Sequence, residues 1–138
     1  MTALFILVLI SFLLMLVLKA SSVGIKHTSN TYLKTQAELF MQSSIENSIL
    51  AIEGYDRIAN NNCLKHIYFT SSDGRFESNI TILRYYCYDK DKNCPNCDIA
   101  TNIKTSKSNG NVLINIIVQT TDKVDKKLRF SKVTIQKP

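Results

Sequence analysis

The first stretch of the chain, residues 1–18, constrains the fold more than any other. Only Thr2 and Ser11 carry a polar side chain in it, and the first charge is Lys19. A helix rises about 1.5 Å per residue, so this stretch covers roughly 27 Å of a hydrocarbon core that is roughly 30 Å thick. The sequence therefore predicts a membrane-spanning helix, whose candidate spanning residues are Ala3, Phe5, Leu9, Phe12, Leu16 and Leu18.

Two other interpretations of this stretch stay open. A cleaved signal peptide would have a basic start, a shorter apolar core and a small-x-small cleavage site. Here nothing basic precedes the stretch, and Ala20-Ser21-Ser22 is only a passable cleavage site. A plain signal anchor, with no role beyond holding the chain at a membrane, is the second alternative.

The following stretch, residues 23–60, changes from continuously apolar to amphipathic. Its apolar side chains recur at intervals of three and four residues, which is typical of a helix with one buried face. They are Leu33, Ala37, Phe40, Met41, Ile45, Ile49 and Ile52. We expect one long helix with a membrane half over residues 1–22 and an amphipathic half over residues 23–60.

Beyond residue 60 the hydrophobic period becomes two, which is typical of strands. Four or five antiparallel strands are expected, at residues 64–70, 76–88, 112–119 and 128–136, with residues 99–105 as the candidate for a short fifth one. Ser72-Asp73-Gly74 is a turn signal that would join the first two strands in a hairpin. The expected fold class is α+β, with the long N-terminal helix packed on a small antiparallel β-sheet that forms a head over residues 61–138.

All four cysteines, Cys63, Cys87, Cys94 and Cys97, lie in the expected head. An even number in a small domain with a thin core favours two disulfides in an oxidising compartment. Cys63 and Cys87 could face each other across the hairpin and leave Cys94 to join Cys97, but all three connectivities remain open. Zinc held by four thiolates, or a redox-active Cys-x-x-Cys, is less favoured, because the motif lies in a loop and has no second copy.

The order of these elements resembles that of the type IV pilin and pseudopilin family. The local match is the run from Ala3 to Phe12, ALFILVLISF, which is close to the apolar part of the family's N-terminus. Family members carry a basic leader ending in Gly, then an aromatic residue and a Glu, before that part. The leader, its Gly and the Glu are missing here, so we expect either a true start upstream of Met1 or a divergent member without the Glu.

The resemblance implies a pilin-like fold and a single-pass location in a bacterial inner membrane, with the C-terminal head in the periplasm. Basic residues in a leader would outweigh Lys19 and Lys26, which follow the apolar run and otherwise argue against an external head. Asn79 is a candidate glycosylation site, because Asn79-Ile80-Thr81 matches the Asn-x-Ser/Thr acceptor. Glu77 completes the extended acidic form of that acceptor, which bacteria with periplasmic N-glycosylation use.

No enzyme motif occurs, so we expect no catalysis, no cofactor and no small-molecule substrate. The resemblance implies a minor pilin or pseudopilin, a structural subunit of a type II secretion, type IV pilus or competence filament. Its partners would be the inner membrane, other pilin or pseudopilin subunits and the assembly platform. In a competence filament Lys126, Lys127 and Arg129 would allow weak, salt-sensitive contact with DNA. The alternative function is a membrane-anchored periplasmic domain with a zinc or thiol-redox site at Cys94 and Cys97.

Overall fold

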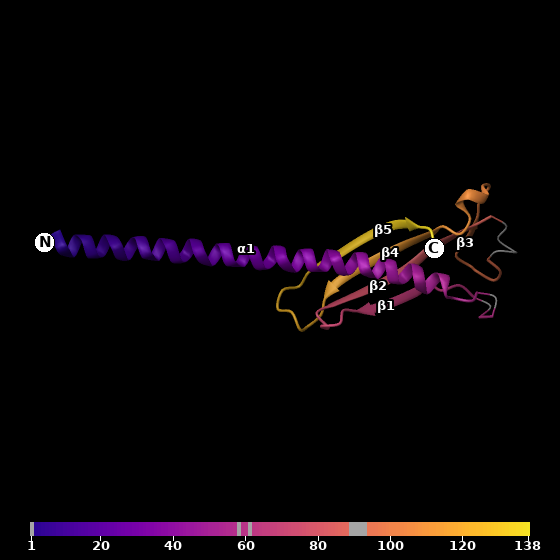
Figure 1. Ribbon diagram of the computed structural model, residues 1–138, viewed down its shortest axis with the longest axis horizontal. Coiled ribbons are helices and arrows are strands. Elements are labelled where there is room, and N and C mark those ends of the chain that lie inside the picture. The colour runs from indigo at the N-terminus through magenta and orange to yellow at the C-terminus, as the bar shows by residue number, and fades with distance from the viewer. Residues whose placement is uncertain (1, 58, 61, 89–93) are drawn as a thin grey trace. The chain divides into compact units, whose positions relative to one another are not determined.

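The chain divides into two compact units, Met1–Gln36 and Ala37–Pro138, which are described separately. The computed structural model describes residues 2–57, 59–60, 62–88 and 94–138. Its elements, labelled in Figure 1, are α1 (Thr2–Glu53), β1 (His66–Thr70), β2 (Phe76–Cys87), β3 (Ala100–Asn102), the 3-10 helix η1 (Ser106–Ser108), β4 (Val112–Thr120) and β5 (Arg129–Gln136). Every expected strand is found, and β3 is shorter than expected.

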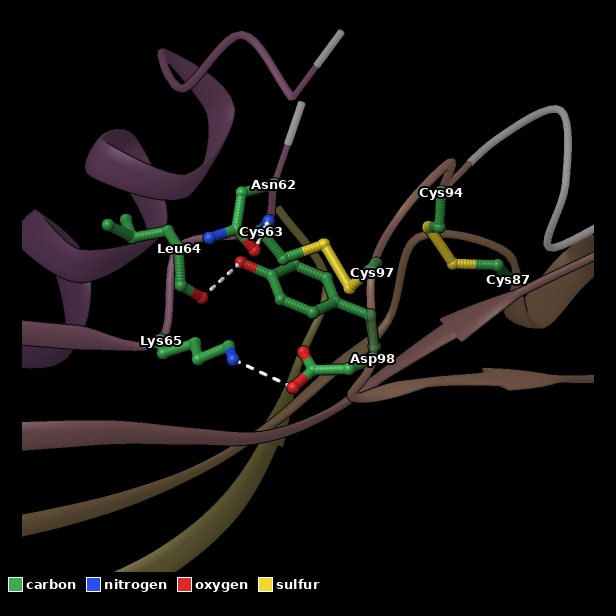
Figure 2. Close-up of a disulfide and its surroundings, with 9 residues drawn as sticks. Asn62, Cys63, Leu64, Lys65, Cys87, Cys94, Cys97 and Asp98 are labelled. Carbon is green, nitrogen blue, oxygen red and sulfur yellow. Dashed lines mark hydrogen bonds and ion pairs between the residues drawn. A yellow bond between two sulfur atoms is a disulfide. The ribbon is translucent and has the colours of Figure 1, made fainter. Parts of the chain in front are cut away.

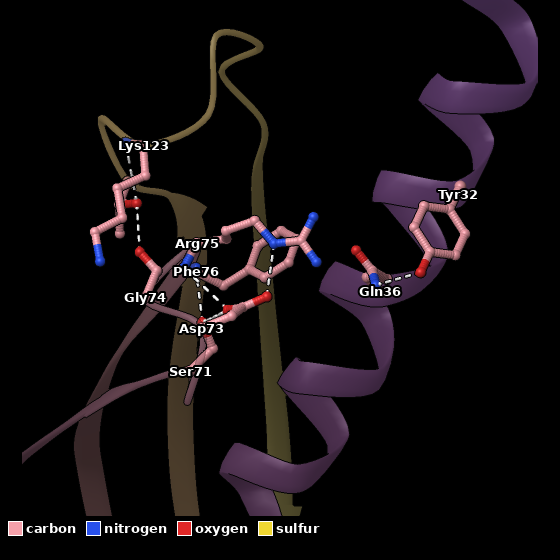
Figure 3. A network of polar contacts seen from close by, with 9 residues as sticks. Tyr32, Gln36, Ser71, Asp73, Gly74, Arg75, Phe76 and Lys123 are labelled. Atoms are coloured by element: carbon pink, nitrogen blue, oxygen red, sulfur yellow. Dashed lines mark hydrogen bonds and ion pairs between the residues drawn. The ribbon is translucent and has the colours of Figure 1, made fainter. Parts of the chain in front are cut away.

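The first unit consists of the first part of α1. Hydroxyl side chains in it turn back on their own helix, because Ser11 donates to the Leu7 carbonyl at 2.9 Å and Thr35 donates to the Thr31 carbonyl at 3.1 Å. Such bonds satisfy a hydroxyl without a partner from another element. The amide of Gln36 donates to the Tyr32 hydroxyl at 2.9 Å, one turn away (Figure 3).

The expected membrane-spanning half of the helix is wrong. Within the described residues, no helix combines the length and the apolar character that a membrane crossing requires. The side chain of Ala3 lies outside the described residues.

Two further expectations, the location and the fold class, are also wrong. The single-pass inner-membrane location with a periplasmic head is contradicted by the same finding. The expected fold class is also wrong in its sheet, which is mixed: β3 runs parallel to the end of β2, with Ala100 beside Tyr85. The amphipathic stretch is helical only to Glu53, and the Gly54 amide closes the last turn on the Leu50 carbonyl at 2.9 Å.

The sheet of the second unit has the strand order β1-β2-β4-β5, and these neighbours are antiparallel. β3 departs from this pattern because of where the chain must return after β2. Cys97 is bonded to Cys63, which lies just before β1, so the chain comes back along the edge of β2 before β3 starts. β3 then runs in the direction of β2 and continues the edge of the sheet beyond the beginning of β1.

One face of the sheet is covered by the part of α1 that follows Ala37 (Figure 1). Alternate residues of β2 and β4 point to this face and are buried, whereas their neighbours on the other face are partly or fully exposed. Period-two burial is what one covered face produces. The buried side chains of the two strands and the helix include Ala37, Ile45, Ile52, Phe76, Ile80, Ile82, Ile114, Ile116 and Val118.

The turn between β1 and β2 is held by the carboxylate of Asp73 (Figure 3). It accepts from the Ser71 hydroxyl at 2.6 Å, from the Arg75 amide at 3.0 Å and from Arg75 Nε at 2.6 Å. Gly74 adopts a φ of 67°, which explains why glycine follows the aspartate. The Thr121 hydroxyl donates to the Gly74 carbonyl at 2.7 Å, so this turn is bonded to the loop after β4.

Candidate functional site

The first candidate site is the apolar segment, which we define as Leu4–Leu18 of α1. Its large apolar side chains are between 48% and 70% exposed, on every side of the helix. Ser11 is the only polar residue in it, and its hydroxyl is already bonded to the helix backbone. Contiguous apolar surface of this extent normally marks an interaction site. A helix that is apolar all round is normally buried.

The second candidate site lies on the open face of the sheet, where the strand register brings polar side chains together. Glu77 of β2 is opposite Gln119 of β4, and Gln119 is opposite Arg129 of β5. In the next row, Tyr68 of β1 is opposite Asn79 of β2. Residues directly opposite in an antiparallel pair share a face of the sheet. We call these five residues the Glu77 cluster.

The carboxylate at the centre of the cluster is fixed by two neighbours. The Tyr68 hydroxyl donates to Glu77 Oε2 at 2.5 Å, and the Gln119 amide donates to Glu77 Oε1. Gln119 first and Tyr68 second lower the pKa of Glu77, because both bonds favour its charged form. The hydrogen bond between the Tyr68 hydroxyl and Glu77 also raises the pKa of Tyr68. Glu77 is therefore a charged acceptor at neutral pH, with each oxygen still able to accept another hydrogen bond.

Two hollows open beside the cluster. One, of about 390 Å³, is lined by all five cluster residues together with Ile117. The other, of about 480 Å³, shares Glu77, Gln119 and Arg129 with the first. Its remaining lining residues come from the end of β4 and the loop between β4 and β5: Thr120, Thr121, Asp122, Lys127 and Leu128. The cluster thus lies between two adjoining depressions that could receive a polar ligand.

The four cysteines form two disulfides, as the sequence predicts, but the favoured pairing is wrong. Cys63 is bonded to Cys97 and Cys87 to Cys94, so the hairpin strands are not bridged to each other (Figure 2). Instead, the loop that carries Cys94 and Cys97 is bonded to Cys63, just before β1, and to Cys87, at the end of β2. An ion pair between Lys65 Nζ and Asp98 Oδ2 at 2.8 Å lies next to the first disulfide.

This pairing bears on the two alternative cysteine chemistries. Cys94 and Cys97 are each bonded to a different partner, so they do not form the internal disulfide of a redox-active Cys-x-x-Cys. All four sulfurs are engaged, which leaves no thiolate for zinc. Across the described ranges, no group of three or more His, Cys, Asp or Glu side chains is arranged to hold a metal ion.

The other predicted site residues lie on the sheet and its loops, and two of them, Asn79 and Arg129, come together in the Glu77 cluster. Asn79 is exposed in the middle of β2, and its glycosylation stays a prediction. Lys127 is paired with Asp122, with Nζ and Oδ1 2.5 Å apart, whereas Arg129 belongs to the Glu77 cluster. Lys126 is exposed in the loop before β5. Contact with DNA through these residues also stays a prediction.

Sequence reasoning did not find the Glu77 cluster. The sequence indicates Glu77 and Asn79 only as parts of a glycosylation acceptor, and Tyr68 and Gln119 only as strand residues. Polar residues at every second position of β2 signal an open face, but they do not say which residues of β1, β4 and β5 lie beside them. That information is in the strand register alone.

Comparison with known proteins adds no relative. No family model, no curated protein and no solved structure matches the chain. The resemblance to type IV pilins and pseudopilins stays a prediction.

Proposed function

We propose that this protein is a structural subunit that assembles with copies of itself or related subunits through the apolar segment of α1. The exposure of that segment is the observation that carries the proposal: its large apolar side chains are about half or more exposed. Burial of apolar surface contributes about 25 cal/mol per Å², so packing such segments against one another is strongly favourable.

The second unit suits the role of a head. Its part of α1 is amphipathic and uses its apolar face on the sheet, with Ala37, Ile45 and Ile52 all buried. On that part of the helix Leu39 and Leu50 stay exposed at separate positions, whereas the large apolar side chains of the apolar segment are exposed throughout. A minor pilin or pseudopilin of a type II secretion, type IV pilus or competence filament is the specific form of this proposal, with related subunits and an assembly platform as partners.

Cysteine cross-linking of the full chain tests the proposal. All four native cysteines are in disulfides, so an added cysteine is the only free thiol. We expect single cysteines placed in turn at residues 9–15 to cross-link with a period of three to four residues, because specific helix packing repeats with the helical turn. The Gln42→Cys variant, at an exposed polar position of the same helix, is the control and should not cross-link.

A charged substitution in the apolar segment provides a second test of assembly. Leu9→Lys should abolish the assembly seen by sedimentation velocity, because an ammonium group would be buried without a partner. Gln42→Lys adds the same charge outside the apolar segment and should assemble like the unmodified chain. Uniform cross-linking along residues 9–15 would indicate nonspecific aggregation and contradict the proposal, as would unchanged assembly of Leu9→Lys.

A further inference from the structure

The lining of the two hollows on the open face of the sheet is balanced in charge. The first hollow contains one carboxylate, Glu77, and one guanidinium, Arg129. The second adds Asp122 and Lys127, which form an ion pair with each other. Because each hollow has equal numbers of positive and negative side chains, neither selects a ligand with a net charge. This balance favours an uncharged ligand over nucleic acid or an acidic peptide.

The first hollow contains both hydrogen-bond donors and hydrogen-bond acceptors. Glu77 is an acceptor, Arg129 is a donor with five N–H groups, and the Asn79 side chain offers both functions. Among the described residues, the side chains of Arg129 and Asn79 make no hydrogen bond or ion pair with one another or with any other group. A hydroxyl group can donate to the carboxylate or accept from the guanidinium, so a ligand with several hydroxyls matches the set.

The hollow also has apolar surface. The Tyr68 side chain is 60% exposed, yet the bond from its hydroxyl to Glu77 fixes the position of the ring. Ile117, half-buried in β4, adds an aliphatic side chain to the lining. A ligand with one apolar face and a polar rim would contact the ring and Ile117 while its rim bonds to the charged groups.

We propose that the Glu77 cluster binds an uncharged carbohydrate. A pyranose has the required combination of an apolar C–H face and a rim of hydroxyls. The first hollow, at about 390 Å³, is large enough for a sugar ring. The second hollow shares Glu77, Gln119 and Arg129 with the first, so the next ring of a longer saccharide could lie in it.

Saturation-transfer NMR on the full chain tests this site, with maltose, cellobiose and N,N′-diacetylchitobiose as the probes. We expect saturable transfer from the protein to the ring protons of at least one of the three disaccharides. Tyr68→Ala should weaken that binding about tenfold or more, since it removes the aromatic contact. Arg129→Gln should weaken it comparably while leaving the ring in place. Tyr68→Phe keeps the ring and should weaken binding by less than Tyr68→Ala.

Matched controls and competing ligands decide the outcome. Tyr88→Ala removes another exposed tyrosine, outside both hollows, and should leave affinity unchanged. Leu9→Lys, which should block assembly, should also leave binding unchanged, so failure of the assembly proposal is separable from failure of this one. Binding of none of the three disaccharides, equal weakening by Tyr88→Ala, or tighter binding of the anionic digalacturonate or the zwitterionic dipeptide Gly-Gly would overturn the proposal.

Discussion

Phe40 of α1 and Phe76 of β2 are stacked, with their ring centroids 6.1 Å apart and their planes 29° from parallel. Phe76 is 3% exposed and begins the longest strand, whereas Phe40 lies on the amphipathic part of the helix and is half-buried. The pair therefore joins the helix to the sheet within the second unit. Its geometry is in the range in which aromatic pairs attract one another beyond the burial of their area.

Removing either ring should destabilise the second unit. Phe76→Ala should lower the free energy of unfolding by about 3–5 kcal/mol, because it leaves a cavity at a fully buried position. Phe40→Ala should cost less, and the double variant should show a coupling of about 0.5–1.5 kcal/mol between the rings. Urea unfolding followed by circular dichroism measures all three. Leu39→Ala, at an exposed neighbouring position, should change stability by less than about 0.5 kcal/mol.

The two disulfides should contribute unequally to stability. The Cys63–Cys97 bridge closes 34 residues, and the Cys87–Cys94 bridge closes seven. On the loop-entropy relation the longer bridge contributes about 4 kcal/mol and the shorter about 2 kcal/mol. Replacing each pair by alanines and comparing urea midpoints tests this order. Equal losses, or a larger loss for the shorter bridge, would contradict it.

The strands were predictable from the sequence because their signal is local. Alternation of apolar and polar residues indicates β2 and β4, and the turn at Asp73-Gly74 is where the sequence places it. The parallel β3 was not predictable, because its direction depends on the Cys63–Cys97 bridge. Sequence spacing alone left three pairings open.

The two candidate sites also differ in how far the sequence alone predicts them. The apolar segment is evident from composition alone, although the expected membrane crossing is contradicted. The Glu77 cluster depends on three register relations between four strands, and a slip of one residue would move Gln119 to the other face. No property of Tyr68, Gln119 or Arg129 in the sequence indicates that they lie together.

Acid should weaken the turn between β1 and β2. The Ser71 hydroxyl first, and then the amide and guanidinium of Arg75, hold the pKa of Asp73 well below its ordinary value of 3.8. A carboxyl whose pKa is lower in the folded state stabilises the fold above its unfolded pKa, and this contribution is lost as the pH falls through the folded value. We therefore expect stability to decline below about pH 4.

The Asp73→Asn variant should reduce this acid dependence, because it removes the titrating group. Asp125→Asn, at an exposed aspartate in the loop between β4 and β5, is the matched control and should leave the dependence unchanged. Thermal unfolding of each variant between pH 2 and pH 7 measures the effect. An unaltered acid slope in Asp73→Asn would show that the turn carboxylate is not its source.

Two buried serines of α1 provide a test of hydrogen bonding in the interface between helix and sheet. Ser44 and Ser48 are 1% and 0% exposed, and both lie on the buried face of the same helix. Ser48 donates to the Ile45 carbonyl at 2.7 Å, whereas the Ser44 hydroxyl has no partner among the described residues.

Ser44→Ala removes a buried group without a hydrogen bond, and Ser48→Ala removes a bonded one. Both variants gain the same helix propensity, so it cancels in the comparison. We expect Ser44→Ala to be more stable than Ser48→Ala by about 1 kcal/mol. Equal stability of the two variants in urea unfolding would mean that the Ser44 hydroxyl finds a partner in solution.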